Sequence, residues 1–329
     1  MLMRFHRSCF LSGTFPRLQR AVVFLSVSFL VFQGHVVMAQ DTGNDGYLHE
    51  TSRKNASKIS PYYFGPNAFA IPDIMYQVSP DLLVELTGNA YMGYRGDKTY
   101  DVSLRASIPL WTRRANLTLW LPVMEWYRNT PENMAASNIA PEKYGEAQRG
   151  HLTGDVYVSI DLQLLEEKRF CPGLTLRAAL KTASGGGYDV ARYYDSAGYF
   201  FDTAVSKRFR LFHPDIYLQA ALSGGFLCWQ TGTGRQNDAV MYGFLLGFEW
   251  KGLRVRETIG GYAGWESSSC VDKELAHDRP FSLKTDVRYG IKNWELIFRY
   301  QHGLADYPYN QFQLGLGYHI DILKKRENK

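Results

Sequence analysis

The chain alternates apolar and polar residues with a period of two over most of its length. The clearest case is the stretch 154–165, where Val156 and Ile160 lie on one side and Asp155 and Asp161 on the other. A period of two is typical of a β-strand, because successive side chains point to opposite faces. The apolar face either packs on the core of a soluble sheet or faces lipid on the outside of a membrane barrel.

Twelve segments of this kind are predicted to be strands: 81–92, 99–110, 115–123, 152–164, 173–183, 197–209, 215–229, 239–250, 253–265, 281–290, 293–301 and 311–322. Most are close to the roughly nine to eleven residues that cross a bilayer at a tilt, whereas strands of soluble proteins usually have about five or six.

The connections between these segments alternate in length. Short links alternate with longer loops, which are predicted at 124–151, 184–196, 230–238, 266–280 and 302–310. Outer-membrane barrels have short periplasmic turns and long external loops, while a soluble sandwich has no reason to sort its loops in this way. The sequence therefore predicts an all-β protein, an antiparallel transmembrane β-barrel of about 12 strands over residues 81–322, with a tail at 323–329.

Charged residues recur on the polar face of nearly every predicted strand. Such residues are costly in a dry core but normal inside a wet or hydrogen-bonded barrel. The candidates for pore-lining residues are Arg105, Asp155, Asp161, Arg177, Lys181, Asp202, Arg254, Lys284, Arg288, Glu295 and Arg299. Over the whole inner face, nine basic positions oppose eight acidic ones. The charges therefore either line a weakly selective pore or pair across strands and stiffen the wall.

One charge breaks the pattern. Glu257 has the same parity as the apolar residues Leu253 and Val255, which places it on the lipid face. A charge there costs free energy, so we expect either a β-bulge near Gly260 and Gly261 or a shifted register.

Tryptophans mark the ends of the predicted strands. Amphipathic rings gather at membrane–water boundaries and form girdles around barrels. Six of the seven tryptophans occupy such positions: Trp111, Trp126, Trp229, Trp250, Trp265 and Trp294. Trp120 lies in the middle of a strand, and its parity points inward.

The first 39 residues predict a cleaved signal peptide. Four arginines precede or border an apolar run at 21–32, and Val37-Met38-Ala39 supplies a small-residue cleavage site. The alternative is a membrane-anchoring helix, but the run is shorter than the about 20 residues that span a bilayer. Removal of the signal lowers the formal net charge from +5 to about +1, so the basic whole-chain charge does not indicate a nucleic-acid partner.

Residues 40–80 differ from both neighbours. A polar stretch is followed by three prolines and several aromatic residues in SPYYFGPNAFAIPDI. The prolines argue against another full strand. This region is expected to be either a periplasmic lead-in or a plug folded into the barrel mouth.

The cysteines do not indicate a disulfide-stabilised scaffold. Cys9 leaves with the signal, and an odd number remains: Cys171, Cys228 and Cys270. A disulfide between Cys228 and Cys270 is left open, because sequence does not show their distance. No metal-ligand spacing, phosphate loop or nucleotide fingerprint is present, so no cofactor, metal or nucleic-acid partner is expected.

A membrane-embedded lipid hydrolase is an alternative with little support. It needs a serine polarised by histidine on the lipid face near the rim. His151 and Thr153 have the nearest spacing, but their parity points into the lumen and the hydroxyl is a threonine's. His302 has outward parity and no serine two residues away. The chain is therefore not predicted to be an enzyme.

Three passages carry a resemblance to known barrels: YYFGPNAFAIPDI, GDVYVSIDLQLLEE and LKTASGGGYD. They resemble uncharacterised outer-membrane β-barrels of the Bacteroidetes type over most of the mature chain. Residues 150–186 also distantly resemble outer-membrane transporters of aromatic-compound degradation. The chain departs from such barrels at its end, where the polar tail after Ile320 replaces a terminal aromatic residue.

These observations predict a bacterial outer-membrane barrel in contact with lipid. Its expected role is a small-solute channel of weak selectivity, for a small polar or weakly anionic solute. The alternative is a structural or adhesive barrel that binds a partner through its external loops, with 124–151 and 184–196 as the candidates.

Overall fold

The computed structural model describes residues 65–323 apart from 137–144, 146–147, 187–196, 212, 233–234 and 265–278. The predicted signal peptide, residues 40–64 and most of the tail lie outside this part. The described elements are β1 (Leu82–Gly93), β2 (Lys98–Pro109), β3 (Ala115–Arg128), α3 (Pro131–Ala136), β4 (Arg149–Leu152), β5 (Tyr157–Leu165), β6 (Gly173–Lys181), β7 (Gly198–Arg210), β8 (Ile216–Gly232), β9 (Arg235–Trp250), β10 (Leu253–Gly264), β11 (Phe281–Ile291), β12 (Trp294–Ala305) and β13 (Tyr309–Ile320).

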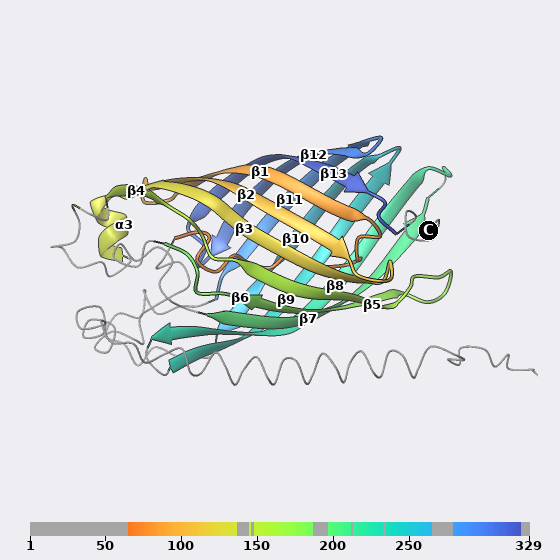
Figure 1. The fold of residues 1–329 in the computed structure, drawn as a ribbon, viewed down its shortest axis with the longest axis horizontal. Coiled ribbons are helices and arrows are strands. Elements are labelled where there is room, and N and C mark those ends of the chain that lie inside the picture. Colours follow the sequence, from red (N-terminus) through yellow and green to blue (C-terminus); the bar gives the residue numbers. More distant parts are fainter. Residues whose placement is uncertain are drawn as a thin grey trace, which may run out of the picture. The chain divides into compact units, whose positions relative to one another are not determined.

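Twelve long strands close into one antiparallel barrel (Figure 1). Each pairs with its neighbours along the chain, and β1 pairs with β13 from Leu82↔Ile320 to Gly93↔Tyr309. The short strand β4 is additional, because it pairs with the last four residues of β3, while the first part of β3 pairs with β5. The predicted twelve-stranded barrel is confirmed.

The two ends of the barrel differ. Tight links join β2–β3, β5–β6, β7–β8, β9–β10 and β11–β12 at what we call the short-turn end. The turn between β9 and β10 has positive φ angles at Lys251 and Gly252, 44° and 87°, as two-residue hairpin turns require. The opposite, long-loop end carries α3, β4 and the longer connections (Figure 1).

Two of the predicted long loops are wrong. At 230–238 and 302–310 the strands continue, with Cys228 paired to Asp238 and His302 to Asn310. Both stretches are polar, so the apolar side of the alternation disappears there although the backbone pairing does not. In these two places the prediction therefore assigned the polar ends of strands to connecting loops.

The outer surface is apolar and the inner face is polar. Val102, Leu104, Leu246 and Leu314, which have the apolar parity of their strands, are exposed, whereas Ser103, on the opposite parity, is buried. No described helix has the length and apolar character to cross a membrane.

The tryptophans follow the predicted pattern with one exception. Trp111, Trp126, Trp250 and Trp294 are exposed, and Trp120 packs against Tyr157 inside the barrel at a tilt of 56°, with 4.7 Å between ring centroids. Trp265 lies outside the described residues. The prediction for Trp229 is wrong: this side chain is buried, because the odd-numbered positions of β8 face inward.

Glu257 does face outward, and neither predicted relief is present. β10 pairs without interruption with both β9 and β11, so there is no bulge at Gly260 or Gly261 and no shift of register. Instead, the hydroxyl of Thr285 donates a hydrogen bond of 2.9 Å to the exposed carboxylate of Glu257.

Replacing Glu257 with leucine is expected to stabilise the barrel in lipid by roughly 1–2 kcal/mol, because a carboxylate then no longer faces hydrocarbon. Equilibrium unfolding of the protein in vesicles measures this change. Glu166→Leu, at an exposed turn position of the short-turn end, is the control and should bring no gain. A loss of stability on changing Glu257 would contradict the lipid-facing assignment.

Candidate functional site

Residues 65–81, here called the luminal segment, run through the inside of the barrel (Figure 1). The segment has no helix or strand, in line with its prolines, which lack the N–H that a ladder needs. It begins beside Tyr91 at the long-loop end and reaches Asn116 at the short-turn end. Residues 40–80 were expected to be a periplasmic lead-in or a plug, and their described part, 65–80, lies inside the barrel.

Side chains of the barrel wall hold the backbone of this segment. A buried backbone without ladder partners must find other hydrogen bonds. The carbonyl oxygens of Asp73, Met75, Tyr76 and Ser79 accept hydrogen bonds of 2.8, 2.5, 3.0 and 3.0 Å from the side chains of Arg177, Thr175, Ser206 and Asn116, respectively. Polar residues on the inner faces of the three strands β3, β6 and β7 thus replace the missing sheet partner.

Phe69 anchors the segment near the long-loop end. Its ring packs against Tyr157, Trp229 and Tyr262 with centroid distances of 6.2–6.4 Å. Gly198 leaves room for the ring, since a Cβ there would lie 2.7 Å from Phe69 Cε2. This contact explains why Trp229 turns inward instead of joining a girdle.

A polar anchor lies beside this aromatic one. The Asn67 amide donates hydrogen bonds of 2.9 and 2.8 Å to Asp101 and Glu125, and its oxygen accepts one of 2.7 Å from Tyr91. The buried carboxylates of β2 and β3 therefore share a donor that comes from the luminal segment.

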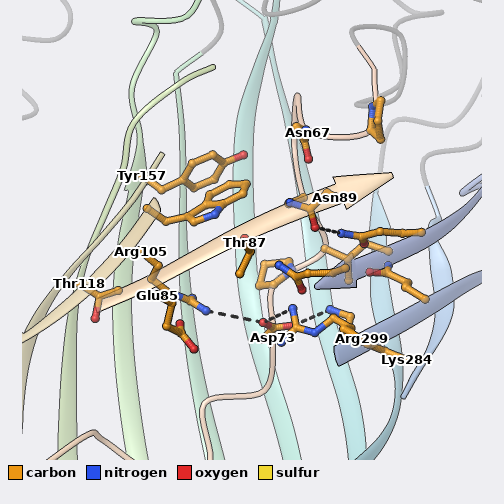
Figure 2. Close-up of a pocket in the computed structure, with 18 of the residues that line it drawn as sticks. Asn67, Asp73, Glu85, Thr87, Asn89, Arg105, Thr118, Tyr157, Lys284 and Arg299 are labelled. Carbon is orange, nitrogen blue, oxygen red and sulfur yellow. Dashed lines mark hydrogen bonds and ion pairs between the residues drawn. The ribbon is translucent and has the colours of Figure 1, made fainter. Parts of the chain in front are cut away.

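Asp73 is the charged centre of the segment. Its Oδ1 lies 2.5 Å from Lys284 Nζ, and its Oδ2 lies 3.1 Å from Arg299 Nη1 and 3.8 Å from Arg105 Nη1. Figure 2 shows the carboxylate between Arg105 on one side and Lys284 and Arg299 on the other. Burial alone would raise the pKa of Asp73, but the positive charges of Arg299, Lys284 and Arg105 outweigh it and hold the pKa well below its usual range.

Other charges of the wall pair with each other. Arg177 forms a two-pronged pair with Asp202, with contacts of 2.7 and 2.9 Å. Arg288 reaches Glu85 at 2.6 Å and Glu295 at 2.9 Å. Most of the wall is therefore internally neutralised, as the near balance of inward charges in the sequence suggested.

Two cavities lie on either side of Asp73. The one toward the long-loop end has a volume of about 130 Å³ and the one toward the short-turn end about 250 Å³. Eight residues line both cavities: Asp73, Glu85, Arg105, Thr118, Arg177, Lys284, Arg288 and Arg299. The cluster around Asp73 is thus the boundary between the two halves of the lumen.

Most of the predicted pore-lining residues come together around the cavity of the short-turn end. These are Arg105, Asp161, Arg177, Arg254, Lys284, Arg288, Glu295 and Arg299. Asp202 lies next to them through Arg177. Asp155 and Lys181 instead form a fully buried ion pair of 2.5 Å near the long-loop end and line neither of these two cavities. Sequence reasoning missed Asp73, because it lies on no strand and no alternation marks it.

The residues considered for lipid hydrolysis do not form a catalytic arrangement. His302 Nδ1 lies 2.7 Å from Asn310 Oδ1, and the hydroxyl that donates to the same oxygen, at 2.9 Å, belongs to Tyr300. His151 and Thr153 are exposed. In the described part of the chain no group of His, Cys, Asp and Glu has a metal-binding arrangement. Cys228 is a buried free thiol, and Cys270 lies outside the described residues.

Comparisons with known proteins agree with the barrel. No family model and no curated protein matches the chain. Among solved structures, the chain is similar to the COG4313 outer membrane channel from Pseudomonas putida F1, at 13% identity and a TM-score of 0.52, over 76% of this chain and 100% of that one. The KdgM porin in complex with disordered oligogalacturonate matches at 10% identity and a TM-score of 0.42, over 72% and 99%. The transport unit of the autotransporter AIDA-I from Escherichia coli matches at 12% and 0.41, over 83% and 98%.

At this level of identity the first similarity concerns the fold. The chain has the fold of a bacterial outer-membrane β-barrel, which confirms that prediction.

Proposed function

We propose that the barrel is an outer-membrane channel for small solutes, closed in the described state by the luminal segment. The observation that carries the proposal is the way the segment is held: wall side chains bind its backbone carbonyls and Asp73, and a cavity lies on each side. Solute passes when the segment shifts.

The contacts between the luminal segment and the wall are of a kind that allows the segment to move. When the lumen hydrates, the hydrogen bonds and ion pairs are exchanged for bonds to water. Their net contribution to the free energy of docking is therefore small compared with that of buried apolar area. Phe69 is the main apolar anchor, and it lies at one end of the segment. The middle of the segment, around Asp73, is held by hydrogen bonds and ion pairs to the wall, and the side chain of Ile74 lies close to Gly243.

The number of strands supports a small solute. Eight-stranded barrels are filled by side chains, and barrels of about sixteen strands leave a wide aqueous channel. Twelve strands lie between these cases, and the luminal segment lines both cavities of the interior here. Displacement of that segment leaves a narrow, polar passage. Adhesion through the external loops remains a prediction from the sequence, and the distant resemblance to transporters of aromatic-compound degradation names no solute.

A disulfide that locks the segment is expected to close the channel. A Cβ on Gly243 would lie 2.8 Å from Ile74 Cδ1 and 3.1 Å from Cγ1, so cysteines at these two positions are close enough to bridge. In a background with the native cysteines replaced by serine, oxidation should lower conductance in planar bilayers at least about tenfold, and a reductant should restore it.

The single variant Ile74→Cys is the matched control and should respond to neither oxidant nor reductant. Equal currents before and after oxidation of the double variant would show that the segment is not the gate. A protein that stays silent when reduced, and also when Asp73 is neutralised, would be a filled barrel and not a channel.

A further inference from the structure

Two cations of the barrel wall depend on the luminal segment for their counter-charge. In the described part of the chain, Asp73 is the only carboxylate within ion-pair distance of Lys284 and of Arg105. Arg299 also contacts Asp286, at 3.0 Å. The other inward-facing basic residues have carboxylate partners on the wall itself, as Arg177 has Asp202 and Arg288 has Glu85.

Of the three cations around Asp73, Lys284 and Arg299 are poorly hydrated, whereas the side chain of Arg105 is 34% exposed. The side chain of Lys284 is 9% exposed and that of Arg299 is 15% exposed. An ammonium group in such a place needs an anion close by, because burial of an unpaired charge is costly. When the luminal segment shifts, the wall therefore presents a positive site that another anion fills.

We propose that Lys284, Arg299 and Arg105 form the binding site for the carboxylate of a small organic acid, and that this solute competes with Asp73 and so releases the luminal segment. The inference rests on the proposed channel function and names its solute class. Asp73 is the internal occupant of the site that the solute takes during passage.

The geometry favours a carboxylate over other anions. The site already holds one, with Lys284 at one oxygen and both arginines at the other, which matches the planar two-oxygen shape of the group. The shared position in both cavities makes the site reachable from either end of the lumen. Beyond it, toward the long-loop end, Gln301 and Gln311 offer amides and Trp120 an apolar face for a short remainder of the solute.

The proposed site implies a charge selectivity that the near balance of inward acidic and basic residues in the sequence does not. Around the short-turn cavity, seven arginine and lysine residues face five carboxylates, and one of the five is Asp73 itself. A wall without the segment in place thus carries a surplus of positive charge around this cavity, and the open state favours anions.

Chemical rescue tests the site without any current. In the mature protein, Asp73→Ala removes the internal carboxylate. Added acetate is expected to bind in its place and to raise the unfolding temperature of this variant in detergent by about 3 °C or more. Acetamide, which is neutral and of similar shape, and chloride at equal ionic strength should have little effect. The wild type should respond less than a third as strongly as the variant, because Asp73 fills its site.

Three control variants define the result. Asp81→Ala removes the carboxylate that pairs with Arg113 at the short-turn end and should show no acetate-specific shift. Addition of Lys284→Gln to Asp73→Ala should abolish the rescue. If Asp73→Ala does not fold, Asp73→Asn keeps the side-chain volume, and calorimetric titration of that variant with acetate and with acetamide tests the same site.

The outcomes separate the inference from the proposed function. Absence of an acetate effect in a folded Asp73 variant that conducts would overturn the carboxylate site and leave the channel intact. An equal effect of chloride or phosphate would overturn the assignment to carboxylates in favour of a general anion site. Rescue by acetate in a protein that never conducts would support the site and overturn the channel.

Discussion

Replacing Asp73 with asparagine is expected to raise the open fraction of the channel by about ten- to a hundredfold. The amide keeps the size of the side chain but leaves Lys284 and Arg105 without their carboxylate. Breaking a buried pair costs about 3–5 kcal/mol, and because Asp73 is 27% exposed we reduce this to roughly 1–3 kcal/mol. Each 1.4 kcal/mol corresponds to a factor of ten in the population.

Single-channel recording in planar bilayers measures the effect. Asp81→Asn is the matched control, since it neutralises the partner of Arg113 at a more exposed ion pair of the short-turn end, and it should leave the open fraction within about twofold of wild type. An open fraction unchanged by Asp73→Asn would mean that this carboxylate does not hold the segment.

The dependence on pH follows from the direction of the pKa of Asp73. Because the docked carboxyl has a pKa well below that of a free aspartate, about 3.9, its contribution to closure is complete above the free value and is lost as the pH falls through the docked one. Closure of the wild type should therefore be constant from about pH 5 to 8 and weaken only below about pH 4. Opening near pH 6.5 would point to a different titrating group.

Replacing Lys181 with methionine is expected to destabilise the barrel by about 3–5 kcal/mol. The side chains of Lys181 and Asp155 are 1% and 0% exposed, so the variant leaves a carboxylate in a dry site without its cation. Asp155 also accepts hydrogen bonds of 2.8 and 2.6 Å from the backbone N–H groups of Ser184 and Gly185. These bonds hold Ser184 and Gly185 just after β6, so these two residues should loosen together with the pair.

Equilibrium unfolding in vesicles gives the free energy, and a double variant supplies the control. Adding Asp155→Leu to Lys181→Met removes both charges and should recover a large part of the loss, because an apolar pair avoids the desolvation of an unpaired ion. Arg114→Met, at the exposed pair with Glu166, should change stability by less than about 1 kcal/mol. A similarly small effect at Lys181 would contradict the buried ion pair.

The barrel itself was predictable because each strand separates lipid from a polar lumen. That division forces residues such as Leu104 and Ser103 to opposite faces, and the alternation records it directly. Alternation also placed Arg105, Lys284 and Arg299 on one side of the wall. It did not show that their side chains meet, because strand tilt and closure decide which heights coincide.

The luminal segment was only half predictable. Its prolines excluded a strand, but its position depends on single hydrogen bonds from Arg177, Ser206 and Asn116 to backbone carbonyls, and such bonds have no sequence signature. Trp229 was assigned to a girdle because it lies near the end of a predicted strand, although the alternation of β8 gives its odd-numbered positions the inward face. Its contact with Phe69 shows what it packs against there.

The position of the luminal segment constrains how the molecule is built. The segment is followed directly by β1, and β1 meets β13 along its whole length to complete the wall. Drawing Phe69 and its polar neighbours through a finished cylinder would strip them of water before any partner was available. We therefore expect β1 and β13 to pair only after the luminal segment has taken its place inside. Insertion of the segment then precedes closure of the barrel during folding.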